Sequence, residues 1–245
     1  MTLTAIVLAA GKGTRMNSDQ AKVLHEVGGR PMVQWVIDHL DELGCDDIVV
    51  VVGYDVVNVT AALPASVRTA HQAEQLGTGH AAQVGLAELD VDVGDTVIVI
   101  SGDMPLISTA SLRDLVDVHR HVGSPVTLLS AMLDEPGAYG RVVRTDDGAI
   151  LAVVEQRDAT PEQRAIREVN TSVYAFDAAF LRNALERLRP DNDQAELYLT
   201  DVVGIAAGDG LVPAAVVVED SREALGINTI DQLAAVSELI EARGS

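Results

Sequence analysis

Short runs of apolar, mostly β-branched residues set the strongest limit on how this chain can fold. They occupy residues 4–8, 48–52, 96–100 and 126–129. Each is apolar along nearly its whole length, whereas a strand with one solvent-facing side would alternate apolar and polar side chains. Such continuous runs are typical of strands that are covered on both faces, as in a parallel sheet packed between helices.

Segments with a helical spacing of apolar residues separate these runs. Residues 32–43 place apolar side chains three and four positions apart, with Pro31 suited to the first turn and Gly44 to the exit. Residues 78–89 and 111–122 repeat the pattern. Alternation of strand and helix as far as about residue 125 implies right-handed crossover connections. We therefore expect an α/β fold, a three-layer α/β/α Rossmann-like sandwich.

The second half of the chain predicts an antiparallel addition to this sheet. Residues 141–145 and 150–155 flank the turn sequence Asp146-Asp147-Gly148, which indicates a hairpin. Thr160 and Gln163 have the spacing of a helix capping box. Further expected elements are strands at 170–176 and 211–218 and helices at 178–188 and 229–242. The economical interpretation is a mixed, mostly parallel sheet with one small antiparallel insertion.

Charge and composition exclude several classes of partner. The 245 residues carry a formal net charge of −20, which argues against binding to nucleic acid, because phosphates need a basic surface. No run approaches 18 consecutive apolar residues, so we expect no membrane span. The single cysteine, Cys45, fits a reducing compartment, and no basic residue precedes the first apolar run, so it is interpreted as a strand and not a signal peptide. We expect a cytoplasmic protein whose oligomeric state stays open, a homo-oligomer included.

The loop after the first expected strand concentrates positive charge. Gly11 and Gly13 allow a sharp backbone bend, and Lys12, Arg15 and Lys22 add three cations. Lys12 and Lys22 are the only lysines of the chain. A solvated turn and a phosphate-binding loop both remain open, and the clustering of cations after a buried strand favours phosphate. A protein this acidic would also need local cations and a metal ion to hold a polyphosphate.

Two familiar phosphate-binding motifs fit this loop poorly. In a dinucleotide fingerprint the third glycine position would hold Met16, and no G-x-x-x-x-G-K-[ST] sequence occurs. An oxidoreductase on a Rossmann fold is therefore a distant alternative.

Residues 8–16 carry the pattern L-x-x-G-x-G-T-R-M, followed by Lys22, and resemble the sugar-nucleotidyltransferase superfamily. The strongest resemblance is to the uridylyltransferase (pyrophosphorylase) domains of bifunctional N-acetylglucosamine-1-phosphate uridylyltransferases. It covers essentially the whole chain and rests most on Q-L-G-T-G-H-A at 75–81 and V-E-Q-x-D-A-T at 154–160. Further matching segments are 102–106, 139–141, 168–171, 197–201 and 226–228.

The resemblance implies a role for each matching residue. Arg15 and Lys22 would act on the triphosphate, and Asp103 with Asn228 would hold Mg²⁺, an ion that prefers oxygen ligands. The nucleotide would lie against Leu8, Ala9, Ala10, Gly11, Gln72, Gly77, Thr78, Ser101, Gly102 and Asp103. The sugar would lie against Gly140, Glu155, Asn170, Thr171 and Asn228.

The implied reaction transfers uridylyl from UTP to N-acetylglucosamine 1-phosphate, giving UDP-N-acetylglucosamine and pyrophosphate. The implied domains are a nucleotidyltransferase unit at 1–228, with a sugar-binding insertion at about 136–170, and a C-terminal helix at 229–245. The hexapeptide repeats of a left-handed β-helix, which bifunctional relatives carry, are absent from this sequence. Two alternatives stay open: another sugar 1-phosphate as acceptor, and a non-catalytic nucleotide-sensing module.

Several positions depart from the family pattern or allow a simpler interpretation. Ser101 stands where an aromatic residue is common, and Ser172 and Ala195 stand where glycine is usual. Asp103 and Asn228 could each cap a helix instead of binding metal. His119 and His121 lie two apart on an expected helix, face different ways and are expected to be solvated.

Overall fold

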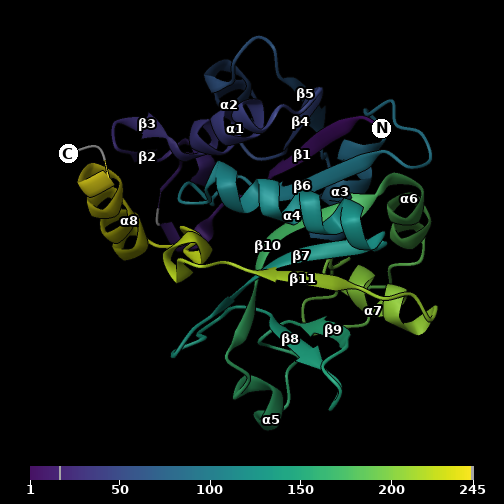
Figure 1. The fold of residues 1–245 in the computed structure, drawn as a ribbon. Coiled ribbons are helices and arrows are strands. Elements are labelled where there is room, and N and C mark those ends of the chain that lie inside the picture. Colours follow the sequence, from purple (N-terminus) through teal and green to yellow (C-terminus); the bar gives the residue numbers. More distant parts are fainter. Residues whose placement is uncertain (17, 244–245) are drawn as a thin grey trace.

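A mixed sheet runs through the centre of the molecule (Figure 1). The computed structural model describes residues 1–16 and 18–243, and within them this sheet has nine strands. The strands are β1 (Leu3–Ala9), β4 (Asp47–Val52), β5 (Arg68–His71), β6 (Thr96–Ser101), β7 (Val126–Met132), β8 (Arg141–Arg144), β9 (Ile150–Val154), β10 (Glu168–Asp177) and β11 (Ala214–Val217).

The strand order explains why the sheet is mixed and mostly parallel. The main path runs β11-β7-β10-β6-β1-β4-β5. Strands β6, β1, β4 and β5 are parallel to one another, as are β11 and β7. Strand β10 lies between β7 and β6 and is antiparallel to both. The carboxyl ends of β1 and β6 therefore meet, with Leu8 opposite Ser101.

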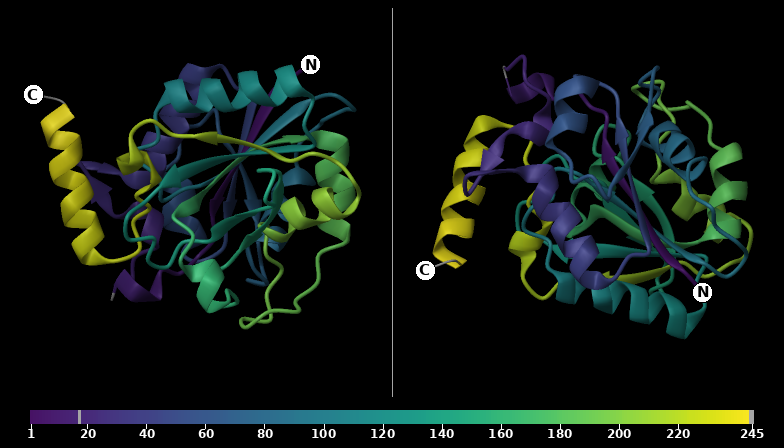
Figure 2. Two further views of the ribbon diagram at one scale, coloured as in Figure 1. Left: turned by 60° about the horizontal axis from the view of Figure 1, so that its bottom comes forward. Right: turned by 90° about the horizontal axis from the view of Figure 1, so that it is seen from above.

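Helices cover both faces and produce the expected three layers (Figures 1 and 2). On one face α1 (Met32–Leu43), α2 (Val56–Ala62) and α4 (Thr109–Val122) pack with alternate residues of β1, such as Ala5 and Val7. On the other face α3 (Thr78–Leu86), α6 (Ala178–Glu186) and α7 (Asp201–Gly208) pack around Ile6. The apolar core is thus two layers separated by the sheet.

Helix ends follow the signals in the sequence. Gly44 ends α1 in the left-handed conformation, with φ of 91°, which costs glycine little because it has no Cβ. Ser108 caps α4 by accepting a hydrogen bond from the Ser111 amide. Thr160 and Gln163 form the predicted capping box at the start of α5 (Pro161–Arg164).

The antiparallel hairpin of β8 and β9 is attached to the sheet through β10. Val169 pairs with Arg141 of β8, while residues 173–177 of the same strand pair with β6. The ladder with β7 is irregular between Asn170 and Tyr174, and Ser172 within that stretch has φ of 61°. Strand β10 therefore changes neighbours halfway along its length, and a strained residue marks the change.

The C-terminal helix α8 (Ile230–Arg243) stands at one side of the molecule, beside the small hairpin of β2 (Glu26–Val27) and β3 (Arg30–Pro31) (Figures 1 and 2). A side chain at Gly28 would come within 2.9 Å of Ile240, so the hairpin turn lies directly on the helix. Three short 3₁₀ turns complete the described part of the fold: η1 (Thr14–Met16), η2 (Lys22–Leu24) and η3 (Ser221–Ala224). The last two residues of the expected 229–245 helix segment lie outside the described residues.

Some expected elements differ in extent. The helix expected at 78–89 ends at Leu86, and the strand expected at 211–218 shortens to Ala214–Val217. Helices α2 and α7 and strand β5 were not anticipated. No helix of the described chain has the length and apolar character needed to cross a bilayer.

The expectation that His119 is solvated is wrong. Its side chain is only 4% exposed, and Nδ1 lies 3.1 Å from the Thr127 hydroxyl of β7. Burial lowers the pKa of His119 to about 4, so the imidazole is neutral at pH 7. His121, two residues on, is exposed as expected.

Candidate functional site

A cavity of about 310 Å³ opens where the carboxyl ends of β1 and β6 meet. Open α/β sheets bind ligands at this edge. The structure brings most of the sequence-predicted site residues to its wall: Leu8, Ala9, Ala10, Gly11, Lys22, Gln72, Gly77, Thr78, Ser101 and Glu155. Gly102 and Asp103 follow Ser101 directly in the chain. The predicted site residues that do not line the cavity are Arg15, Gly102, Asp103, Gly140, Asn170, Thr171 and Asn228.

The turn after β6 is tightly packed. The Gly102 amide donates to the Leu8 carbonyl at 2.9 Å, and a Cβ at position 102 would lie 3.3 Å from that oxygen and from Val23. Asp103 follows in a buried position, 6% exposed, so its carboxylate is held at the edge of the sheet by the strand itself.

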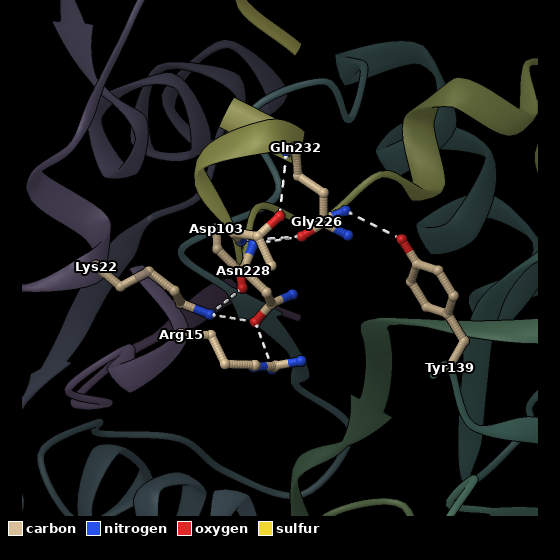
Figure 3. Close-up of polar contacts among 8 residues, drawn as sticks. Arg15, Lys22, Asp103, Tyr139, Gly226, Asn228 and Gln232 are labelled. Atoms are coloured by element: carbon tan, nitrogen blue, oxygen red, sulfur yellow. Dashed lines mark hydrogen bonds and ion pairs between the residues drawn. The ribbon is translucent and has the colours of Figure 1, made fainter. Parts of the chain in front are cut away.

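Cations and oxygen ligands meet in one network beside the cavity (Figure 3). The Lys22 ammonium forms an ion pair with the Asp103 carboxylate and donates to the Asn228 side-chain oxygen at 3.0 Å. Arg15 donates to the same Asn228 oxygen at 3.0 Å. The two predicted phosphate-binding cations and the two predicted metal ligands are therefore in direct contact.

Asn228 reaches this network from the far end of the chain because hydrogen bonds to the backbone on either side hold its loop. The Ile227 amide donates to the Asp103 carbonyl at 3.0 Å. The Gln232 side-chain oxygen accepts from the Asn228 amide at 2.8 Å and from the Thr229 amide at 3.1 Å, while Thr229 Oγ1 accepts from the Gln232 amide. Thr229, and not Asn228, therefore caps α8, and the Asn228 side-chain oxygen makes its contacts with Lys22 and Arg15 instead.

The end of the cavity beside α3 is lined by amide groups. Gln72 is buried, and its Nε2 donates to the Gly77 carbonyl at 3.1 Å and lies 3.1 Å from His80 Nδ1. Gln75 Nε2 donates to the Ala10 carbonyl at 3.0 Å, which joins this segment to the glycine-rich loop. Gly77 has φ of 110°, and a Cβ there would lie 2.6 Å from the Leu197 carbonyl, so only glycine fits.

The opposite end is lined by Glu155, which accepts from the Thr200 hydroxyl at 3.3 Å. Burial raises the pKa of Glu155, and the nearby charges of Asp158 and Asp201 raise it further. A Cβ at Gly140 would lie 3.1 Å from Val153 and 3.6 Å from Glu155, so a larger residue here would crowd Val153 beside the carboxylate.

Asn170 and Thr171 lie behind this end of the cavity. The Asn170 amide nitrogen donates to the Tyr174 hydroxyl at 2.7 Å, and Tyr174 lines the cavity. Thr171 is 1% exposed, and its hydroxyl donates to the Leu129 carbonyl at 2.9 Å. The Thr171 side chain is therefore occupied by the core, and the structure does not bring it to the cavity.

Several cavity residues had no role assigned from the sequence. The clearest are Gln75 and Thr200, with Ser172 and Glu196 also in the wall. Gln75 and Thr200 lie inside the sequence segments that match the family, so the pattern contained a signal for them. Tyr139, in another such segment, accepts from the Gly226 amide at 3.4 Å and joins the insertion to the Asn228 loop (Figure 3).

A metal ion at this site would depend on few protein ligands. Within residues 1–16 and 18–243 no group of three or more His, Cys, Asp or Glu side chains is arranged to hold one. Asp103 and Asn228 nonetheless offer a carboxylate and an amide oxygen side by side. This donor set suits Mg²⁺, which keeps several waters and binds few protein ligands when phosphates are present.

The fold and the site together define an α/β protein with a cationic cavity at the carboxyl edge of its sheet. Its parts are a glycine-containing loop after the first strand, cations beside a carboxylate, and an amide-lined end of the cavity. Residues 5–198 match the family model of the MobA-like NTP transferase domain, and the chain belongs to this family.

Similar proteins extend over nearly the whole chain. It is 46% identical to the bifunctional protein GlmU of Mycolicibacterium vanbaalenii over 97% of its length, and 44% identical to that of Trichlorobacter lovleyi over 98%. It spans about half the length of these relatives (50% and 52%). The fold is shared with a solved nucleotidyl transferase from Methanothermobacter, with a TM-score of 0.67. The match covers 99% of both chains, at 18% sequence identity.

Proposed function

We propose that this protein transfers uridylyl from UTP to N-acetylglucosamine 1-phosphate and releases pyrophosphate. The contact between Lys22, Arg15, Asp103 and Asn228 beside the cavity carries this proposal, since it gathers the groups needed to bring two anions together. The similarity to bifunctional GlmU proteins supports the choice of substrates.

In this proposal the nucleoside lies along residues 8–11 and against the amide-lined end of the cavity. Gln72 and Gly77 meet the uracil edge, where a side-chain oxygen and a backbone N–H offer an acceptor and a donor. Gly11 has no atom within 4 Å of where its Cβ would stand, so the loop leaves room for a ligand.

The reaction needs positioning more than proton transfer. A phosphate oxygen of the sugar substrate forms a bond to the α-phosphorus of UTP, and the bond from that phosphorus to the bridging oxygen breaks as pyrophosphate leaves. The attacking oxygen is already ionised at pH 7, so no general base is required. Arg15 can donate two parallel hydrogen bonds to the leaving pyrophosphate, and the Lys22 ammonium lies near the α-phosphate as a point charge.

Asp103 and Asn228 fit a magnesium ion by the chemistry of their oxygens, and nucleotidyltransferases of this family are generally magnesium-dependent. When bound, the ion supplies charge neutralisation between the phosphates. The Lys22 ammonium contacts both oxygens, so an ion held by Asp103 and Asn228 would take the place of this ammonium.

The sugar in this proposal lies at the Glu155 end, with Gly140, Asn170 and the Thr171 backbone around it. Residues 136–170 would then form a sugar-binding insertion in a nucleotidyltransferase unit of residues 1–228, and α8 would form the separate C-terminal segment. Glu155 accepts hydrogen bonds from sugar hydroxyls in this arrangement.

The test is pyrophosphate release from UTP, N-acetylglucosamine 1-phosphate and Mg²⁺. We expect steady release that stops when the sugar phosphate is left out and when EDTA is added. Failure to release pyrophosphate in the presence of Mg²⁺ and both substrates would refute the proposal.

A second acceptor sugar is suggested by Ser101 and Ser172, which line the cavity at positions where the family pattern has an aromatic residue and glycine. Comparing kcat/KM for the glucosamine, glucose and N-acetylglucosamine 1-phosphates decides between the acceptors.

A non-catalytic nucleotide sensor is the remaining alternative. In an enzyme, Asp103→Ala lowers turnover by orders of magnitude, because the lost group acts on the transferred phosphate. A wild-type protein that binds UTP but turns over no sugar phosphate would favour the sensor.

A further inference from the structure

Lys12 is a cation of the glycine-containing loop that takes no part in the network beside the cavity. Lys22 and Arg15 are both held in that network (Figure 3). Lys12 is exposed, and within the described residues its side chain forms no ion pair and no hydrogen bond. Its ammonium lies 5.1 Å from the centre of the Tyr54 ring. A neutral ring attracts a cation but does not cancel its charge, so the ammonium remains available to an anion.

Tyr54 is tied to the segment of chain that carries Lys12. The Tyr54 amide donates to the Ala10 carbonyl at 3.0 Å, and its hydroxyl donates to the Asp19 carbonyl at 3.0 Å. These two acceptors lie on either side of Lys12 in the chain. The ring therefore holds the lysine side chain against the loop, and not out in solvent.

The loop carries Lys12 along the edge of the cavity. Gly11, which precedes it, lines the cavity and has no atom within 4 Å of where its Cβ would stand. Gly13, which follows it, packs on the Lys22 side chain, because a Cβ there would lie 2.6 Å from Lys22 Cβ. Lys12 thus stands between the cavity wall and the residue that the proposed function places near the α-phosphate.

The terminal phosphate of UTP has no group assigned to it so far. In the proposed arrangement the nucleoside lies along residues 8–11, Lys22 lies near the α-phosphate and Arg15 donates to the leaving pyrophosphate. The terminal phosphate is the part of UTP furthest from the nucleoside, and it is absent from the UDP-sugar product. In a chain with a net charge of −20, a local cation is needed to hold so anionic a group.

We propose that Lys12 binds the terminal phosphate of UTP and thereby distinguishes the triphosphate substrate from the diphosphate product. This inference rests on the proposed function for the placement of the nucleotide. The ammonium donates hydrogen bonds to phosphate oxygens, and its flexible four-carbon stem lets it turn from the Tyr54 ring to the phosphate. Lys12 is a binding residue, since it touches the substrate directly.

The test compares the dissociation constants of UTP and UDP, measured by calorimetry with Mg²⁺, in the wild type, Lys12→Met and Lys12→Arg. We expect Lys12→Met to bind UTP about tenfold more weakly, the lower end for a hydrogen bond to a charged group. Its affinity for UDP should match the wild type. Lys12→Arg keeps the charge and should recover most of the affinity for UTP. A general disturbance of the loop would instead weaken both nucleotides alike.

Arg30→Met is the matched control. Arg30 also lies over an aromatic ring, 4.8 Å from the centre of Trp35, but it belongs to β3 and pairs with Asp38. The substitution changes the net charge as much as Lys12→Met does, so it measures the long-range effect of charge alone. Because salt screens that effect, we expect both nucleotide affinities to stay within about twofold of the wild type.

An unchanged ratio of UTP to UDP affinity in Lys12→Met would overturn the inference and leave the proposed transfer reaction standing. A selective loss of UTP affinity, together with a wild type that releases no pyrophosphate, would support the inference and refute the transfer reaction. The two failures are therefore distinguishable.

The wild-type protein supplies an independent check, because Lys12 and Lys22 are its only lysines. Protein labelled with ¹³C at the lysine ε position therefore shows two side-chain NMR signals, and the one lost in Lys12→Met belongs to Lys12. We expect this signal to move when UTP and Mg²⁺ are added and to move much less with UDP. Equal displacement by the two nucleotides would contradict a contact with the terminal phosphate.

Discussion

At the scale of single residues, Lys22 has the most informative surroundings. Its ammonium touches both oxygens that the proposed function assigns to magnesium, so cation and metal exclude each other at Asp103. The Asp103 carboxylate is thus paired with a cation of the chain itself. When no nucleotide is present, a divalent ion must displace the Lys22 ammonium from Asp103, and no phosphate is available to pair with that ammonium.

Lys22→Met should therefore bind Mn²⁺ more tightly than the wild type when no nucleotide is present. We expect at least about a fivefold gain, the lower end of usual coupling between two interacting sites. Electron paramagnetic resonance of free Mn²⁺ measures it. Lys12→Met is the control, because the Lys12 ammonium lies over the Tyr54 ring and not at Asp103. Equal affinities in Lys22→Met and the wild type would refute the competition.

Two departures from the family pattern turn out to be strained residues. Ser172 and Ala195, which stand where glycine is usual, have φ of 61° and 52°. The sequence comparison located both positions, but only the backbone explains why glycine is common there.

Ala195→Gly should stabilise the protein by about 0.5–1 kcal/mol. Glycine removes the strain of the left-handed backbone in the folded state, and this gain exceeds the loss from the greater conformational entropy of glycine in the unfolded state. Ala87→Gly makes the same chemical change at an exposed residue with φ of −64° and should destabilise by a similar amount. Urea unfolding of both variants measures the change in the free energy of unfolding, which we expect to be opposite in sign for the two substitutions. A loss of stability in Ala195→Gly would contradict the assigned strain.

At the scale of elements, the sequence predicted those with a strong apolar period and missed those formed by tertiary pairing. Strand β5 has the sequence Arg-Thr-Ala-His with only Ala70 buried, so no apolar run marks it, and it exists because β4 pairs with it. Helix α2 begins with two valines, which favour strands, and α7 contains Gly204 and Gly208, which disfavour helices.

Two capping boxes of the form Thr-x-x-Gln occur among the described residues, and one of them touches the site. Gln163 accepts from the Thr160 amide at α5, whereas Gln232 accepts from both Thr229 and Asn228 at α8. We expect Gln163→Met and Gln232→Met to lose similar stability, about 1 kcal/mol. Only Gln232→Met should weaken Mn²⁺ binding in the presence of UTP, by about tenfold, as loss of a ligand's supporting hydrogen bond does.

Gln232→Glu should restore most of that affinity, because a glutamate at the same position accepts the same two N–H groups. Calorimetry of Mn²⁺ with UTP present compares the four proteins. A similar change of metal affinity in Gln163→Met and Gln232→Met would show that general stability, and not the position of Asn228, is responsible.

At the scale of the whole molecule, the three-layer sandwich and its mixed sheet were predicted from the sequence, but the path of β10 was not. An apolar run predicts a buried strand but not the direction of that strand relative to its neighbours, so nothing in residues 170–176 predicts antiparallel pairing. The buried His119 was missed for a related reason. Its neighbour Thr127 lies on β7, and only the packing of α4 on the sheet brings the two together.

His119 should make stability depend on pH. Its folded pKa of about 4 lies below the unfolded value of 6.5, so the unfolded state binds the extra proton first, and stability is lost as the pH falls from 6.5 towards 4. The loss reaches up to about 3 kcal/mol. His119→Gln, which keeps a partner for Thr127, should flatten the profile of urea unfolding over this range. His121→Gln should follow the wild type, and a His119→Gln profile as steep as the wild type would rule out this origin.

Strand β10 pairs with two different parts of the molecule. Residues 173–177 complete the central sheet next to β6, while Val169 anchors the hairpin of β8 and β9. The junction between them, at Ser172, borders the cavity. Replacing the hairpin with one of different length or chemistry would leave the β6 pairing untouched. Under the proposed function, the sugar side of the cavity could then be re-engineered while the nucleotide side keeps its geometry.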